Sequence, residues 1–210
     1  MEALLRLYAL PPDPEAPLVC FDEAGKELRR ARRPDLPAHP GRPRYEDPEY
    51  ERLGSANLFM LYAPHLGWRH VAVTARRTAT DFALAMRELV DVHFPHARRI
   101  IVVLDNLNTH SHGALYQTFP AAEAERIAQR LDLRFTPKHG SWLNMAEIEL
   151  SVLARQCLQQ RIPDPETLAT TVSAWADHRN RVAAPARWRF TVEDARISLK
   201  RLYPEPTYAP

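Results

Sequence analysis

Hydrophobic and polar positions alternate along the chain in two different periods, one typical of strands and one typical of helices. Five short apolar or alternating segments predict strands, at residues 18–21, 57–62, 68–74, 100–104 and 132–136. Residues 100–104 are Ile, Ile, Val, Val and Leu, so we expect a strand buried on both faces. The first strand is predicted to end at Asp22 and to turn at Gly25.

Apolar residues at helical spacing predict five helices, at residues 80–93, 121–131, 143–158, 164–178 and 191–201. Ser141 is expected to cap the third of them. Residues 1–10 resemble a short linker helix. This order of strands and helices predicts an α/β domain with a mixed sheet and helices on both faces. We divide the chain into an extended entry (1–17), a main domain (18–182) and a C-terminal helix with a tail (183–210).

Length and composition narrow the class of protein. The chain has 210 residues, of which 45% are hydrophobic and 26% charged, as in an ordinary folded domain. Its longest aliphatic run has five residues, and no secretory signal begins the sequence, so we expect a cytoplasmic protein without a membrane partner. Two cysteines are too few for a disulfide framework or a zinc cage.

Positive charge is concentrated in one stretch. The net charge is only +2, but residues 26–46 hold seven basic residues against three acidic ones, among many prolines. The candidates for contact with a DNA backbone are Arg29, Arg30, Arg32, Arg33, Arg42 and Arg44. A solvated surface is the alternative interpretation of the same residues.

Two predicted strands end on an aspartate, at Asp22 and at Asp105. Functional groups in open α/β sheets gather beyond the carboxyl ends of parallel strands. If the two strands are neighbours, the aspartates approach each other, which favours a bound divalent cation. A turn-capping role is the alternative for each of them.

The helix predicted at 143–158 supplies a third acid. Projected at 100° per residue, Glu147 falls within the apolar arc and Glu149 on the polar side. We therefore expect Glu147 to face the two aspartates and Glu149 to face solvent, with a Glu147–arginine pair as the alternative. A site of two aspartates and one glutamate suits Mg²⁺ or Mn²⁺ rather than zinc.

Further polar residues accompany these acids, and we expect them to have supporting roles. Residues expected to orient a ligand or to contact DNA are Asn106, Asn108, His110, Lys138, His139 and Asn144. Turn and cap chemistry is the alternative for the asparagines, and an ordinary exposed loop for Lys138 and His139.

The segments Asp105–His110 and Thr136–Glu147 resemble the DDE transposases of bacterial insertion sequences, in particular the insertion sequence 630 family, which is related to mariner elements. The Val-Cys-Phe-Asp-Glu stretch matches the family's first acid at Asp22. The resemblance implies an RNase H-like five-stranded mixed sheet, with Asp22, Asp105 and Glu147 as catalytic residues that hold two Mg²⁺ or Mn²⁺ ions. The spacing of 42 positions from Asp105 to Glu147 is longer than in mariner relatives, and we assign the excess to the helix at 121–130.

The resemblance also implies DNA as the partner, both transposon ends and target, and a homodimer in the active complex. The family normally places helix-turn-helix domains before the catalytic domain, so we expect end recognition either to be supplied by a separate N-terminal helix-turn-helix chain or to be lost. The predicted activity is cleavage and transfer of DNA strands. Two alternatives stay open: a non-catalytic DNA-binding regulator of a full-length transposase, and an RNase H-like nuclease without strand transfer.

Overall fold

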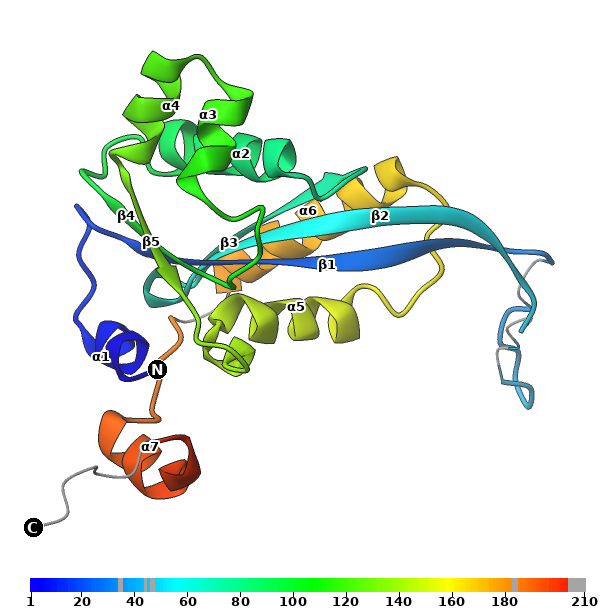
Figure 1. Ribbon diagram of the computed structural model, residues 1–210. Helices are drawn as coiled ribbons and strands as arrows, with labels where there is room; N and C mark the ends of the chain where they lie inside the picture. The colour runs from blue at the N-terminus through cyan, green and yellow to red at the C-terminus, as the bar shows by residue number, and fades with distance from the viewer. Residues whose placement is uncertain (34–35, 44, 46–47, 183–184, 204–210) are drawn as a thin grey trace, which may run out of the picture.

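A computed structural model describes residues 1–33, 36–43, 45, 48–182 and 185–203. Its centre is a five-stranded mixed sheet in the order β3-β2-β1-β4-β5 (Figure 1). The strands are β1 (Leu18–Ala31), β2 (Tyr50–Ala63), β3 (Trp68–Thr74), β4 (Ile100–Leu104) and β5 (Leu131–Phe135). Strands β1, β2 and β3 are antiparallel neighbours, whereas β4 lies parallel to both β1 and β5.

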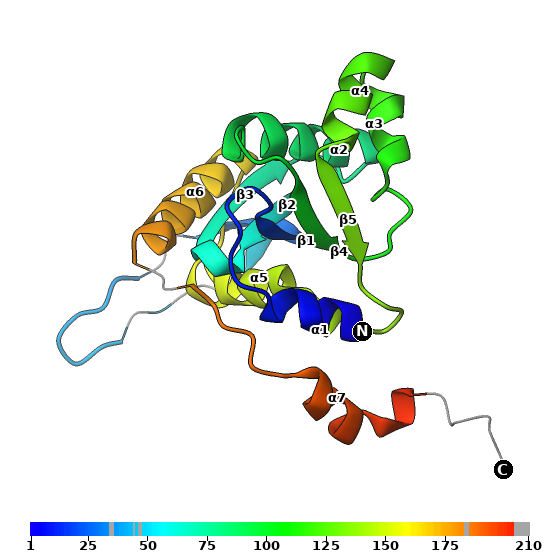
Figure 2. The same cartoon turned by 90° about the vertical axis from the view of Figure 1, so that its left-hand side faces the viewer.

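Helices cover both faces of this sheet, as the sequence predicted (Figure 2). One face carries α2 (Ala79–Glu88), α3 (His112–Thr118) and α4 (Ala121–Ala128). The other face carries α1 (Glu2–Ala9), α5 (Met145–Gln156) and α6 (Pro165–Val182). Because side chains alternate along a strand, β1 sends Val19 and Phe21 into the first core and Leu18 and Cys20 into the second.

The first strand is much longer than predicted. It does not turn at Gly25 but continues to Ala31, paired with β2 in a two-stranded ribbon that projects from the body of the molecule (Figure 1). The pairing shifts register after Leu28, where Gly54 on β2 adopts a φ of +113° that favours glycine. Leu28 itself is buried against the core, so a polar-looking segment still has one apolar face.

The helices agree with the predictions except at several ends. Residues 89–93 form a π-helix after α2, and α3 was not predicted. The predicted cap at Ser141 is wrong: Asn144 caps α5 by accepting a hydrogen bond from the Ala146 amide, and Ser141 opens a short 3₁₀ turn.

Helix α7 (Val192–Ser198) is capped by Thr191 in a capping box, and an ion pair between Arg196 and Glu2 joins it to α1. No helix in the described ranges is both long and apolar enough to cross a bilayer.

Candidate active site

Asp22 and Asp105 lie at the same edge of the sheet because of how β1 and β4 pair. The two strands run parallel, and their pairing covers residues 18–20 of β1 and 101–103 of β4. Continued for two residues, this register places Asp22 beside Asp105. Since β4 ends at Leu104, β1 has only β2 beside it at Asp22, and the Asp22 side chain is half-buried.

Glu147 reaches this edge from the first turn of α5. Asn144 fixes the start of that helix against β1, because its side-chain amide donates a 2.8 Å hydrogen bond to the carbonyl of Phe21, the residue before Asp22. Asn144 is 1% exposed, so its role is to position the helix and not to contact DNA. Glu147 itself is exposed, one turn into the helix.

The predicted burial is wrong for both glutamates of α5. Glu147 does not lie on the core-facing side, and Glu149, predicted to face solvent, is buried. Glu149 Oε1 lies 2.8 Å from Nε of Arg69 on β3 and 3.2 Å from Nη2 of Arg179 on α6. The projection treated one apolar arc as the buried side, but β3 and α6 each supply an arginine partner to Glu149 on its other side.

The three acids interact electrostatically. Burial, together with the negative charges of Asp105 and Glu147, raises the pKa of Asp22 to about 6, although a hydrogen bond from the Glu23 amide lowers it. An aspartate that is this costly to ionise among other acids indicates a place where a cation belongs.

The donor set fits a hard divalent ion. Every candidate ligand atom is a carboxylate oxygen, which Mg²⁺ and Mn²⁺ prefer. The three side chains are not closed into a tight cluster, since their oxygens do not all lie within 4.8 Å of one another. Mg²⁺ keeps several of its water molecules when it binds protein, so it does not require all of its protein ligands to be in contact with one another.

His110 supports Asp105 from the opposite face of the sheet. Its Nδ1 lies 2.7 Å from Asp105 Oδ1, and its Nε2 lies 2.9 Å from Glu23 Oε2. Burial disfavours the charged ring, but the hydrogen bond to Glu23 and the charges of Glu23 and Asp105 outweigh it and raise the pKa of His110. The imidazole packs on Phe21 and Phe82, so its position is fixed.

Glu23 is the site residue that sequence analysis missed. It follows Asp22 directly, and successive strand residues point to opposite faces, so Asp22 faces α5 while Glu23 faces His110. The sequence signal was a second acid directly after the first, at the end of an apolar strand. In the structure the Glu23 side chain is only 5% exposed. An acid at such a position requires a partner, and the loop after β4 supplies it.

The other predicted residues are less closely tied to the site. Asn106, Asn108, Lys138 and His139 are all exposed on the loops after β4 and β5. Arg29, Arg30, Arg32, Arg33 and Arg42 lie on the projecting ribbon or its tip, away from the carboxylates. Arg44 falls outside the described residues.

In metal-free protein, we expect Asp22→Asn to stabilise the fold at neutral pH. The folded protein binds a proton at Asp22 more tightly than the unfolded chain does, so ionisation above pH 6 costs stability, by at most about 3 kcal/mol. The gain should therefore be largest near pH 8 and disappear as the pH falls toward 3.8, the ordinary pKa of aspartate. Urea unfolding of both proteins in EDTA, between pH 3.8 and pH 8, measures this difference in the free energy of unfolding.

The exposed Asp177 supplies the control, because Asp177→Asn alters a charge that lies on the outer side of α6. Its free energy of unfolding should follow that of the wild type at each pH. A metal-free Asp22→Asn variant that is less stable than the wild type at pH 8 would contradict the electrostatic account of the site.

The five-stranded mixed sheet and its helices form an RNase H-like domain, and solved structures share this architecture. A crystal structure of the Mos1 mariner paired-end complex with Mn matches with a TM-score of 0.56 at 16% identity, over 84% of this chain and 52% of that one. The corresponding complex with Mg matches with the same score and identity, over 89% and 54%. The Mos1 strand transfer complex matches at 0.53 and 14%, over 87% and 52%.

The chain thus spans about half the length of these solved chains. The shared fold confirms the predicted RNase H-like mixed sheet.

No curated protein matches the sequence. Residues 17–169 match the model of the DDE superfamily endonuclease family, and this match covers most of the chain. The protein belongs to the DDE superfamily endonucleases.

Proposed function

We propose that this chain is the catalytic domain of a DDE transposase of the insertion sequence 630 type, which cleaves DNA strands and transfers them. The observation that carries the proposal is the arrangement of Asp22, Asp105 and Glu147. They come from β1, the end of β4 and the first turn of α5, and two of them raise the pKa of the third. Family membership supports the same reaction class.

In this proposal Asp22, Asp105 and Glu147 hold two Mg²⁺ or Mn²⁺ ions. When bound, the ions supply activation of the attacking oxygen and charge stabilisation at the leaving oxygen of a phosphodiester. The chain's own contribution is to fix the ligands: Asn144 holds α5 against β1, and His110 holds Asp105. Water serves as the nucleophile for cleavage, and the released 3′-hydroxyl serves as the nucleophile for joining to target DNA.

The test is a cleavage and joining assay with Mg²⁺ on DNA that carries the terminal repeats flanking the gene for this chain. The proposal expects both nicked and joined products from this chain, or from this chain together with a helix-turn-helix chain. Nicked products without any joined product would indicate a nuclease. No cleavage under either condition, with DNA binding retained, would indicate a regulator.

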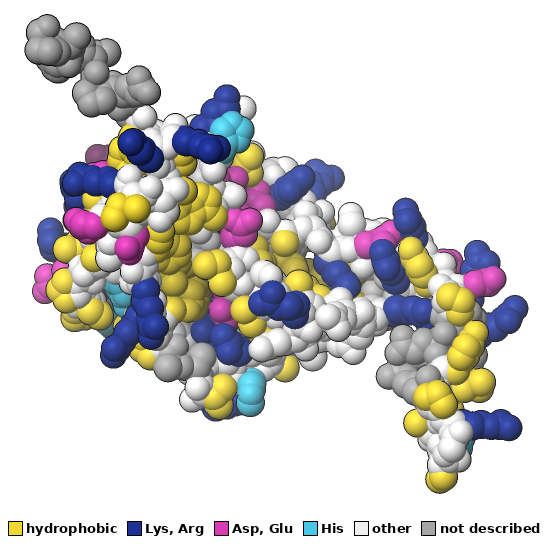
Figure 3. All heavy atoms as spheres, turned by 90° about the horizontal axis from the view of Figure 1, so that it is seen from below, with side chains coloured by type: hydrophobic (Ala, Val, Ile, Leu, Met, Phe, Trp, Pro, Cys, Tyr) yellow, Lys and Arg dark blue, Asp and Glu magenta, His cyan; other side chains and the backbone are white. Residues whose placement is uncertain are grey.

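The projecting ribbon is the candidate DNA-backbone surface, but it is less positive than its arginines suggest. A few acidic side chains lie among the Lys and Arg side chains on it (Figure 3). Arg29 pairs with Glu27, Arg30 with Glu51, and Arg32 with Glu49. Residues 27–33 and 49–52 together hold five arginines and three glutamates. Partial neutralisation leaves a modest positive excess on a surface that extends from the site.

We expect Arg30→Ala with Arg32→Ala to weaken DNA binding equally for all sequences and to flatten its salt dependence. Each phosphate contact contributes a slope of about −0.9 in log K against log salt, so loss of two contacts reduces it by up to about 2. Binding titrations at several salt concentrations measure the slope. A preference of this chain for terminal-repeat over scrambled DNA beyond about tenfold would contradict phosphate-dominated binding.

The pair Arg98→Ala and Arg99→Ala is the matched control. These arginines also form ion pairs, with Glu15 and Asp132, but they precede β4 and so lie at its opposite end from Asp105. Their replacement should leave the slope unchanged. An equal reduction of the salt slope in both double variants would mean that DNA binding depends on the total charge of the chain and not on the ribbon.

A further inference from the structure

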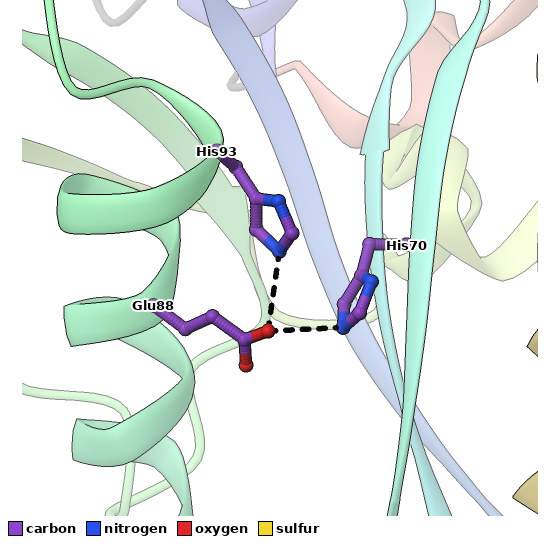
Figure 4. Close-up of side chains that lie close together, drawn as sticks. All are labelled: His70, Glu88 and His93. Atoms are coloured by element: carbon purple, nitrogen blue, oxygen red, sulfur yellow. Dashed lines mark ion pairs between the residues drawn. The ribbon is translucent and has the colours of Figure 1, made fainter.

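A second group of metal-binding side chains lies between the outer strand of the sheet and the end of α2. His70 comes from β3, Glu88 is the last residue of α2, and His93 is the last residue of the π-helix (Figure 4). Among the described residues, they form the only such group of three whose ligand atoms all lie within 4.8 Å of one another. None of them belongs to the carboxylate site, which lies at β1 and β4.

The distances match those around a tetrahedral zinc ion. Nε2 of His70 and Nε2 of His93 each lie 3.5 Å from Oε1 of Glu88. Zinc binds histidine nitrogen and carboxylate oxygen at about 2.1 Å, so neighbouring ligands of a tetrahedral ion stand about 3.4 Å apart. The carboxylate oxygen thus stands at ligand spacing from each imidazole nitrogen and too far from either for a strong hydrogen bond, and the two nitrogens lie within 4.8 Å of each other.

The π-helix explains how His93 joins the group. Residues five apart in an α-helix point about 140° away from each other. The Phe94 amide instead bonds to the Leu89 carbonyl, five residues back, and this wider turn brings His93 round to the side of Glu88. Trp68 packs against the His93 ring at a centroid distance of 4.9 Å and holds it there.

The Nε2 atom of His93 is buried and finds no hydrogen-bond partner in the described part of the chain. A buried polar atom without a partner is costly, and a metal ion would satisfy it. Two imidazoles and one carboxylate, with the fourth position open to water, form a donor set that zinc uses in proteins. Mg²⁺ prefers oxygen ligands and would not compete strongly for imidazole nitrogen.

We propose that His70, Glu88 and His93 bind one Zn²⁺ ion, which joins the outer strand β3 to the end of α2. The site is independent of the carboxylate site and of the reaction proposed there.

The test is calorimetric titration of the metal-free full-length chain with ZnCl₂ in the presence of excess Mg²⁺. We expect one equivalent to bind, and His70→Gln or Glu88→Gln to weaken the affinity by more than about tenfold. Both side chains are partly exposed, so these variants should fold, which circular dichroism verifies. Cobalt in place of zinc should give the visible absorption of a tetrahedral ion.

Three controls separate this site from other zinc ligands. His96→Gln alters an exposed histidine three residues along the chain, Cys157→Ser removes a partly exposed thiol, and Asp105→Asn alters the carboxylate site. All three should bind zinc as the wild type does. The proposal is overturned if no saturable binding occurs, if His70→Gln and Glu88→Gln bind normally, or if a control variant loses the ion.

Discussion

Asp105→Asn and Glu147→Gln are each expected to reduce Mg²⁺-dependent DNA cleavage by at least about a hundredfold while the fold stays intact. Changing groups that only orient a metal ligand typically costs ten- to a hundredfold, so loss of a ligand itself costs at least the upper value. Both substitutions keep the shape of the side chain and remove one negative charge from a site where the acids repel. Cleavage rates and thermal unfolding of the same preparations provide the measurement.

Metal binding supplies a second readout that does not depend on turnover. Mg²⁺ or Mn²⁺ should raise the melting temperature of the wild type and should do so less in each variant. Glu166→Gln is the matched control, because Glu166 is also an exposed glutamate in the first turn of a helix, α6. If Glu147→Gln cleaves as fast as Glu166→Gln, Glu147 is not a ligand.

Glu149→Gln is expected to destabilise the protein by about 3–5 kcal/mol. Arg69 has a fully buried side chain whose Nε lies 2.8 Å from Glu149, and removing the negative charge leaves that guanidinium uncompensated. The same glutamate also holds Arg179, so β3, α5 and α6 lose their common contact. Asn180 continues to exchange hydrogen bonds with the Arg69 backbone, which limits the damage to the ion pair.

A double variant isolates the charge interaction. Arg69→Met with Glu149→Leu removes both buried charges and should be less destabilising than either single substitution, since well-packed apolar residues can replace a buried pair. Chemical unfolding measures all three free energies. Additive losses would show that the two side chains do not interact, and a loss below about 0.5 kcal/mol for Glu149→Gln would place it with ordinary surface positions.

The contrast between Glu147 and Glu149 shows where sequence reasoning stopped. A helical projection measures only where apolar residues lie on one helix, and α5 is covered on more than one side. Glu149 is buried because Arg69 and Arg179, 80 and 30 positions away along the chain, meet it there. Pairing over such distances has no local signal, so the projection assigned the wrong burial to both glutamates.

The long ribbon was missed for a related reason. Asp22, Glu23 and Gly25 are residues that usually end a strand, and locally they favour a turn. Pairing of β1 with β2 from Cys20 to Ala31 outweighs that preference, and burial of Leu28 adds to it. Strand pairing is a tertiary contact, and β-propensity yields to it readily.

The sequence by itself determined the order of the main strands and helices, the mixed sheet, and the expectation that Asp22, Asp105 and Glu147 belong together. Those features follow from local periodicity and from motif spacing, which are properties of neighbouring residues. The sequence also marked His110 as a candidate to orient a ligand, but only the tertiary structure decided that Glu23 pairs with it, that Glu149 is a buried ion-pair partner, and that His70, Glu88 and His93 meet. Each of these depends on side chains from separate elements, and their distances are set by packing of the whole fold.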